Sequence, residues 1–280
     1  MKNAKVILIS GVSSGFGNVT AKYLAQKGCW VFGISRTPEK VMLPNTETEK
    51  WPGSLEIIKM DVNYANSIRE GIKKIIERTG RLDVVVNNAG YSLAGSIEDT
   101  SLREAKDQFN TNFFGVHEVC SQVIPIMRKQ QSGYIINISS LSGLVGLPFQ
   151  ALYSASKYAI EGYTEALRIE VKTFGIKVSL IEPGDFRTSF TEHRHITKSS
   201  QSDPVYQNRF KESLKAVEES ERKGDSPEKI ARLVERIINT DSPRLRYRIG
   251  PSSTFVGLKP FIPERIVETI ITRYYSSNLK

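Results

Sequence analysis

Short apolar runs rich in β-branched residues alternate with longer segments of helical periodicity along most of the chain. These runs cover residues 5–10, 30–35, 55–62, 82–88, 134–139, 177–182 and 246–250. The alternation is typical of β-strand–α-helix–β-strand units that wind into a parallel sheet. The run Val84–Val86 is apolar on both faces, as a central strand must be when helices cover both sides of its sheet. The pattern therefore predicts an α/β fold.

The composition fits a soluble globular protein with one domain spanning residues 1–280. Of the 280 residues, 39% are hydrophobic and 25% are charged, which excludes the disordered, fibrous and membrane-spanning classes. Cys29 and Cys120 lie in apolar segments without paired metal-ligand spacing, and no signal-peptide pattern follows the start of the chain. We therefore expect a reducing, cytoplasmic location.

The net charge of +9 is mostly scattered along the chain. Its one local concentration is Arg244, Arg246 and Arg248, which would project from one face of a strand. Charged edge strands resist edge-to-edge pairing, and this explanation is favoured over a phosphate-binding ridge, so no nucleic-acid partner is predicted. His193 and His195 stand in a polar loop and are interpreted as solvated or lid residues, so no metal site is predicted.

A glycine-rich turn follows the first apolar run and leads directly into a helical segment. Glycines allow a tight turn and let the backbone approach a pyrophosphate, whose charge the helix N-terminus then stabilises. A phosphate-binding P-loop is excluded because no Gly-Lys-Ser/Thr follows. Glycines that serve only helix–sheet packing are the alternative. The turn residues expected to bind a dinucleotide are Gly11, Ser13, Ser14, Gly15, Phe16 and Gly17.

The end of the second apolar run predicts which dinucleotide is preferred. An acidic residue at this place accepts hydrogen bonds from a ribose 2′-hydroxyl, whereas a cation suits a 2′-phosphate. The chain has Ser35 and Arg36 here and no carboxylate before Glu39. Because arginine binds phosphate in a planar, bidentate manner, we predict NADP(H) rather than NAD(H). The alternative is that Arg36 is a solvated loop charge.

The stretch YSASK places a phenol, Tyr153, and an ammonium, Lys157, four residues apart. On a helix these positions share one face, with Cβ atoms roughly 5–6 Å apart, so both groups could act on one bound molecule. The same spacing occurs by chance in many helices. The pair therefore gains meaning only from the motifs around it.

Seven motifs together resemble the short-chain dehydrogenase/reductase family, and in particular its 17β-hydroxysteroid dehydrogenase-like group. They are SGVSSGFG at 10–17, MDV at 60–62, NNAG at 87–90, NTNFFG at 110–115, INISSLSG at 136–143, YSASK at 153–157 and IEPGDFRT at 181–188. Their order and spacing match over essentially the whole chain. The resemblance implies a doubly wound Rossmann fold with a seven-stranded parallel sheet and a small helical lid insertion.

The resemblance also implies a catalytic tetrad of Asn112, Ser140, Tyr153 and Lys157. Tyr153 would exchange a proton with the substrate oxygen, and Ser140, 13 residues before it, would hydrogen bond to that oxygen. Lys157 and the oxidised nicotinamide are expected to lower the Tyr153 pKa from its ordinary value of about 10. By analogy, Lys157 also holds the nicotinamide ribose, and Asn112 holds a water that connects Lys157 to solvent.

The remaining cofactor contacts follow from the same resemblance. Asp61 and Val62 would contact the adenine. Asn87, Asn88, Ala89 and Gly90 would line the adenosine side. Four residues of the IEPGDFRT turn would surround the nicotinamide, with the last one reaching its carboxamide. These are Pro183, Gly184, Phe186 and Thr188.

Two segments are expected to shape the substrate pocket. The region 187–225 interrupts the regular alternation with a polar loop and an apolar-striped helix, and is interpreted as a substrate lid. The segment 251–280, with Ile266, Ile270 and Tyr274 on one stripe, is expected near the substrate pocket or a subunit neighbour. Weak membrane association of this basic, amphipathic helix is an alternative. The family resemblance implies a homodimer or homotetramer.

The sequence favours an NADP(H)-dependent oxidoreductase that interconverts a carbonyl and an alcohol on a small, lipophilic substrate. A non-catalytic NADP(H) sensor is a second hypothesis, because the fold alone never proves an activity. The intact tetrad disfavours it, since a sensor needs no such set. A reductase of ketoacyl thioesters on a carrier protein is a third, for which the positive charge could dock an acidic partner.

Overall fold

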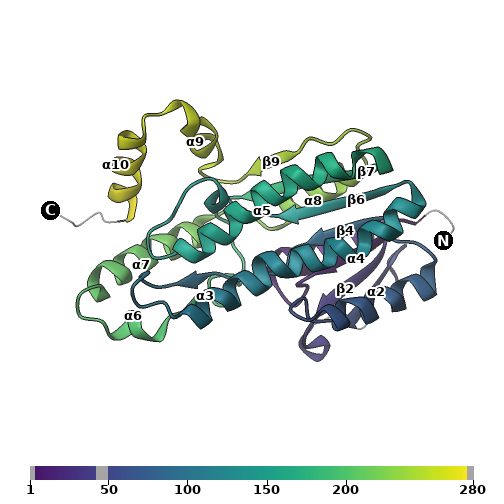
Figure 1. The fold of residues 1–280 in the computed structure, drawn as a ribbon, viewed down its shortest axis with the longest axis horizontal. Coiled ribbons are helices and arrows are strands. Elements are labelled where there is room, and N and C mark those ends of the chain that lie inside the picture. Colours follow the sequence, from purple (N-terminus) through teal and green to yellow (C-terminus); the bar gives the residue numbers. More distant parts are fainter. Residues whose placement is uncertain (1–3, 42–49, 276–280) are drawn as a thin grey trace.

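The computed structural model describes residues 4–41 and 50–275, which form a parallel sheet between two layers of helices (Figure 1). The seven strands are ordered β3-β2-β1-β4-β6-β7-β9, and each adjacent pair is parallel. All seven predicted strands and the α/β Rossmann topology are confirmed. The strands are β1 (Val6–Ser10), β2 (Trp30–Ser35), β3 (Ser54–Lys59), β4 (Val84–Asn87), β6 (Gly133–Ile138), β7 (Ile176–Pro183) and β9 (Arg246–Ile249).

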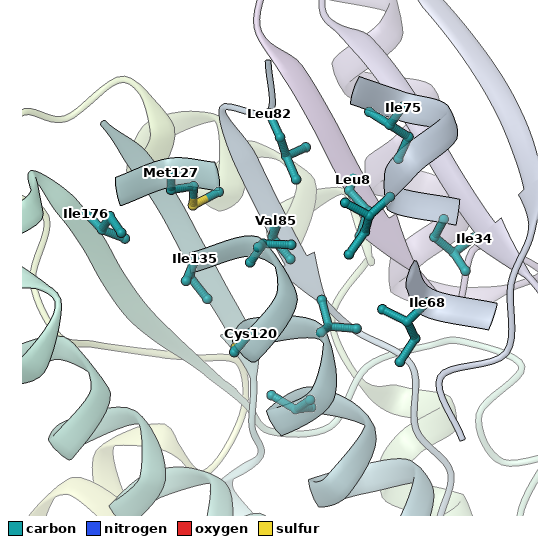
Figure 2. Close-up of a cluster of buried hydrophobic side chains, with 14 of the residues drawn as sticks. Leu8, Ile34, Ile68, Ile75, Leu82, Val85, Cys120, Met127, Ile135 and Ile176 are labelled. Carbon is teal, nitrogen blue, oxygen red and sulfur yellow. The ribbon is translucent and has the colours of Figure 1, made fainter. Parts of the chain in front are cut away.

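Helices cover both faces of the sheet because alternate strand residues are apolar on each side. On one face, Leu8, Val85 and Ile135 pack against α2 (Ala65–Thr79), α4 (Gly115–Gln130) and α5 (Ala151–Glu170) (Figure 2). On the other face, the neighbouring residues Ile7, Val84 and Ile136 pack against α1 (Gly15–Gln26) and α8 (Glu228–Ile238). This pattern of burial is the physical basis of the two-sided fold.

The elements outside these layers lie mostly beyond the carboxyl ends of the strands. The region predicted as a lid contains a two-residue strand and two helices, and its strand pairs with β5. The C-terminal α10 packs against α7 (Figure 1). The helices and strands concerned are β5 (Leu93–Ala94), α3 (Leu102–Phe109), β8 (His195–Ile196), α6 (Lys198–Ser202), α7 (Gln207–Lys223), α9 (Ser253–Leu258) and α10 (Glu264–Tyr275).

Short helical turns connect several of these elements. A π-helical turn, Asn110–Phe114, joins α3 to α4, and the turn Leu141–Gly143 follows β6. The other turns are Pro38–Lys40, Lys172–Phe174 and Lys259–Phe261. In the part of the chain that the structure describes, no helix combines the length and apolarity that crossing a bilayer requires.

Candidate active site

A cavity of about 1060 Å³ lies along the carboxyl ends of the strands. Its walls include residues from the ends of β1, β2, β4, β6 and β7, where ligands bind in open parallel sheets. The volume is at the upper end of the roughly 300–1,000 Å³ typical of small-molecule sites. The cavity is therefore large enough for an extended ligand or for two ligands side by side.

Most of the site residues predicted from the sequence line this one cavity. Three do not: Gly17, Asn87 and Asn112 lie outside its lining. The predicted residues that line it are Gly11, Ser13, Ser14, Gly15, Phe16, Arg36, Asp61, Val62, Asn88, Ala89, Gly90, Ser140, Tyr153, Lys157, Pro183, Gly184, Phe186 and Thr188.

The glycine-rich turn brings the N-terminus of α1 to the cavity. Gly11 and Gly15 have positive φ angles of 73° and 56°, which favour glycine. A Cβ atom on Gly11 would lie 2.8 Å from the Ala89 Cα atom, so the turn and the end of β4 are in close contact. The backbone here forms a cradle at a helix N-terminus that a larger side chain would fill, which fits the phosphates of a dinucleotide.

Asn88, which the resemblance placed with its NNAG neighbours at the adenosine side, also holds the glycine-rich turn. Its side-chain amide donates hydrogen bonds to the carbonyl oxygens of Ser10, at 2.9 Å, and Gly11, at 3.1 Å. In return, the Ser10 hydroxyl accepts hydrogen bonds from the backbone N–H groups of Asn88 and Ala89, both at 3.0 Å. These four bonds fasten the glycine-rich turn to the end of β4. This fastening role was not predicted, because the bonds join segments that are distant in the sequence.

Gly17 contributes packing rather than a cavity wall. A Cβ atom on Gly17 would clash with the carbonyl oxygen of Gly11 and with the Asn88 side chain. We expect Gly17→Ala to lower the free energy of unfolding by about 1–3 kcal/mol, measured by urea denaturation, because the backbone has no room to shift. Gly162→Ala is the matched control, since Gly162 is exposed in α5 with no atom within 4 Å of the added Cβ. Equal stability of Gly17→Ala and wild type would contradict this account.

Tyr153 and Lys157 lie one turn apart on α5 and are both buried, with exposures of 7% and 6%. The Lys157 ammonium lies 5.9 Å from the centre of the Tyr153 ring and donates a hydrogen bond of 2.8 Å to the Ile138 carbonyl oxygen. Burial lowers the pKa of Lys157 to about 8. The pair on one face of the helix was predicted, and its geometry is as expected.

A lowered pKa was predicted for Tyr153. For the protein without a bound cofactor this prediction is wrong, because the shift has the opposite direction. Burial raises the pKa of Tyr153 to about 12, while a hydrogen bond with Ser140 lowers it by a smaller amount. Desolvation disfavours the charged phenolate, and in this protein it outweighs the hydrogen bond with Ser140. Tyr153 is consequently a protonated phenol near neutral pH.

Ser140 stands at the start of the turn that follows β6. Its hydroxyl accepts a hydrogen bond of 3.1 Å from the backbone N–H of Ser142, which holds the side chain toward Tyr153. The neighbouring serines, Ser139 and Ser142, also line the cavity. The Ser140 hydroxyl, the Tyr153 phenol and the Lys157 ammonium therefore converge on one wall of the cavity.

The side chain of Asn112 is buried and hydrogen bonded to protein groups. Its amide donates to the Tyr91 carbonyl oxygen at 3.0 Å and to the Ser156 hydroxyl at 3.2 Å, and its oxygen accepts from the Tyr91 backbone N–H at 3.1 Å. Both amide hydrogens are thus engaged with protein groups. Asn112 braces the π-helical turn against α5, and π-helical turns are frequent at functional sites.

Asn87 also serves the core rather than the cavity. Its side chain donates a 2.8 Å hydrogen bond to Asn137 on β6 and lies 3.4 Å from the Cys120 sulfur. Buried amides of this kind stay hydrogen bonded to other protein groups. The Asn87 amide therefore bonds within the core, and its contact with the adenosine side stays a prediction.

Arg36 is exposed at the mouth of the cavity, directly after β2. The Ser35 hydroxyl accepts a 3.1 Å hydrogen bond from the backbone N–H of Thr37, which shapes the turn that follows the strand. Within the described residues, no ion pair involves Arg36. Its guanidinium remains available to a ligand, and Asp61 lies on the same cavity lining at the end of β3.

Comparison with known proteins agrees with this arrangement. Residues 5–199 match the family model described as short chain dehydrogenase. The chain belongs to the short-chain dehydrogenase family.

Relatives of this short-chain dehydrogenase are similar over nearly their whole length. It is 40% identical over 274 residues to the 3-ketodihydrosphingosine reductase of Bacteroides thetaiotaomicron, which covers 97% of this chain and 98% of the relative. A short-chain dehydrogenase structure from Streptomyces avermitilis is 30% identical, with a TM-score of 0.82 and coverage of 98% and 97%. The structure of ElxO with NADP bound is 28% identical, with a TM-score of 0.72 and coverage of 88% and 97%. Other solved neighbours hold NADP or NAD.

A group of apolar side chains also lines the cavity of this short-chain dehydrogenase. Phe190 packs on Tyr153, with ring centres 5.9 Å apart. Ile270 was expected near the pocket from the sequence, whereas nothing in the spacing of residues such as Val145 and Val256 distinguishes a pocket wall from ordinary core. The apolar lining residues here are Val145, Leu147, Phe190, Val217, Phe255, Val256, Ile270 and Ile271.

Proposed function

We propose that this short-chain dehydrogenase reduces the ketone of a lipophilic molecule with NADPH. One observation carries the proposal: the Tyr153 phenol, the Ser140 hydroxyl and the Lys157 ammonium share a cavity with the glycine-rich turn. Acid–base groups and a dinucleotide cradle in one cavity are what carbonyl reduction requires. A protein that only senses the cofactor needs no buried acid beside it.

The residues present fit a nicotinamide dinucleotide. The backbone of Gly11–Gly15 and the N-terminus of α1 would hold the pyrophosphate, and Arg36 would bind a 2′-phosphate on the adenosine ribose. Asp61 and Val62 would flank the adenine. The Pro183–Thr188 turn would border the nicotinamide, which supplies the hydride when bound.

The proton chemistry follows from the state of Tyr153. A phenol with a pKa of about 12 is protonated near neutral pH, so it can donate its proton to the carbonyl oxygen as hydride reaches the carbon. Ser140 would hydrogen bond to the same oxygen as negative charge develops there. The Lys157 ammonium would stabilise the phenolate left behind and hold the ribose hydroxyls. The raised pKa of Tyr153 favours its role as an acid over its role as a base.

The lipophilic substrate class rests on the apolar part of the cavity. Val217 on α7 and Ile270 on α10 face this part from the predicted lid and from the C-terminal segment. We therefore assign the two segments the role of closing the substrate pocket. The 40% identical relative acts on 3-ketodihydrosphingosine by its name, and we propose a long-chain ketone of this kind as the substrate. The resemblance to 17β-hydroxysteroid dehydrogenases makes a ketosteroid the second candidate.

The test is a comparison of kcat/KM at saturating NADPH for 3-ketodihydrosphingosine, a ketosteroid and a ketoacyl group carried on acyl carrier protein. We expect turnover to be highest with the long-chain ketone. Higher activity on the carrier-bound thioester would replace the proposal with a ketoacyl reductase. Tight NADPH binding without turnover of any carbonyl compound would favour the sensor.

We also propose that the protein is a homodimer or homotetramer through α4 and α5. Three large apolar residues at this face are exposed: Phe114, Tyr158 and Ile169, at 53%, 42% and 75%. Exposed apolar residues gathered on one face are typical of subunit contacts. Multi-angle light scattering tests this assembly, and a monomer at micromolar concentration would contradict it.

A further inference from the structure

A cluster of buried charges lies behind Lys157, outside the cavity lining. It is built by three neighbouring elements, α5, β7 and β9. Glu161 on α5 is 5% exposed and Glu182 on β7 is fully buried, although carboxylates rarely occupy such positions without partners. The proton transfer proposed above uses neither residue. Their burial therefore calls for a separate explanation.

Two arginines of the edge strand β9 pair with these carboxylates. The Arg246 Nε atom lies 3.1 Å from Glu161 Oε2 and 3.0 Å from Glu182 Oε1. Its Nη2 atom reaches Glu165, one turn further along α5, at 2.5 Å. The Arg248 Nε atom lies 2.8 Å from Glu182 Oε2. Of the three alternating arginines that the sequence analysis assigned to edge protection, Arg246 and Arg248 thus serve as partners for buried acids.

Lys157 borders this cluster on the side of the cavity. It stands four residues before Glu161 on α5, so the two side chains share one face of the helix, with Cβ atoms roughly 5–6 Å apart. The protein partner of the ammonium is the neutral Ile138 carbonyl oxygen. A buried ammonium with one neutral acceptor loses its proton easily unless an anion is close. Glu161 is the carboxylate that acts on Lys157, and it raises the Lys157 pKa against the effect of burial.

The charges of the cluster balance when Lys157 is protonated. Lys157, Arg246 and Arg248 supply three cations, and Glu161, Glu165 and Glu182 supply three anions. Within the described residues, Oε1 of Glu161 accepts no hydrogen bond, and Oε1 of Glu182 has only its ion pair with Arg246 Nε. Burial raises the pKa of both carboxyls, whereas their arginine partners lower it.

We propose that Glu161, supported by Glu182, is a positioning residue that keeps the Lys157 ammonium protonated through its negative charge. The inference rests on the proposed function, since it assigns Glu161 a role through a catalytic lysine. Without this counter-charge, Lys157 would be neutral over much of the working pH range. It would then no longer stabilise the Tyr153 phenolate.

The direct test measures the protonation of Lys157 without any substrate. Lysine labelled with ¹³C at Cε reports the charge of each side chain by NMR, and the Lys157 signal is assigned by its loss in Lys157→Met. We expect a titration midpoint of about 8 in wild type. In Glu161→Gln the midpoint should fall by about 1 pH unit, the lower end of the effect of a nearby opposite charge. Glu182→Gln should lower it by a smaller amount.

Glu165→Gln is the matched control, because it also removes a carboxylate that pairs with Arg246. Glu165 binds the same arginine from the same helix, but it is 51% exposed and lies two turns from Lys157. We expect the Lys157 midpoint of Glu165→Gln to match that of wild type. Glu161→Asp keeps the negative charge, so its Lys157 midpoint should lie close to the wild-type value. If Glu161→Gln does not fold, Glu182→Gln tests the proposal in its place. The folded Glu182→Gln variant must then show a lowered titration midpoint for Lys157.

Kinetics separate this inference from the proposed function. For carbonyl reduction, the alkaline limb of the pH profile of kcat/KM should move to lower pH in Glu161→Gln. At pH values above this limb, kcat/KM should be about 10-fold lower than in wild type, whereas at pH 6 it should be nearly unchanged. A uniform loss at every pH, or an unmoved NMR midpoint in folded Glu161→Gln, would overturn the role of Glu161. A shifted midpoint in a protein that reduces no carbonyl compound would overturn the proposed function alone.

Discussion

Replacing Tyr153 with phenylalanine is expected to lower kcat for carbonyl reduction by about 10³-fold, within the range of a general acid. The ring is retained, so its packing against Phe190 at 5.9 Å and the burial of α5 should persist. Only the proton donor is removed from the cavity wall. NADPH affinity, measured by fluorescence titration, should stay within a few fold of wild type. The loss should therefore appear in kcat rather than in cofactor binding.

Tyr158→Phe is the matched control for this change. Tyr158 is on the same helix, is 42% exposed and has its hydroxyl 3.2 Å from the Lys259 ammonium rather than in the cavity. Removing that hydroxyl should leave kcat near the wild-type value. Retention of more than a tenth of the activity in Tyr153→Phe would show that another group donates the proton.

Arg36→Asp is expected to raise the KM for NADPH by about 10- to 100-fold, the effect of losing a hydrogen-bonded charge partner. The new carboxylate would repel a 2′-phosphate and accept hydrogen bonds from a 2′-hydroxyl, so the KM for NADH should fall. The change lies at the mouth of the cavity, and kcat should be nearly unaffected. The measurement is a comparison of kcat/KM for the two cofactors in both proteins.

Lys40→Asp makes the same charge reversal at an exposed site four residues after Arg36, and this site is not part of the cavity lining. It controls for the general loss of positive potential. It should lower NADPH efficiency only slightly and leave the ratio of NADPH to NADH efficiency close to wild type. Equal kcat/KM of the wild type with NADPH and NADH would contradict the assignment of Arg36 as the phosphate-binding residue.

The sheet could be predicted from the sequence because its signal is local. Each strand is a short apolar run, and a central run such as Val84–Val86 must be apolar on both faces when helices cover both sides. The glycine-rich turn was also predictable, since positive φ angles at Gly11 and Gly15 restrict the residue type. These features depend on residues that are neighbours in the chain.

The features that the sequence did not predict depend on contacts between distant segments. Asn112 and Asn87 lie within recognisable motifs, but their side chains bond to Tyr91, Ser156 and Asn137, which only the folded chain brings near. The raised pKa of Tyr153 is likewise a consequence of burial by several elements. Spacing along a helix shows which groups share a face, but it does not show how far they are removed from water.

The buried acids show the same limit. Glu161 and Glu182 are 21 residues apart in the sequence and resemble ordinary surface carboxylates there. The structure places them between Arg246 and Lys157, where they have consequences for a third group. Alternating charges on an edge strand can face solvent and protect the edge, or they can face the protein and pair with buried groups. Only the tertiary structure decides between these two arrangements.

The most direct test of the central claim is hydride transfer itself. Wild-type protein is given NADPH carrying deuterium at C4 of the nicotinamide, on the transferred side, together with 3-ketodihydrosphingosine, and the product is examined by mass spectrometry. The account predicts an alcohol with deuterium on the carbon that carried the ketone, and no such product from Tyr153→Phe under the same conditions. Unchanged ketone with undiminished deuterated NADPH, for this ketone and for a ketosteroid, would contradict the assignment of this cavity to carbonyl reduction.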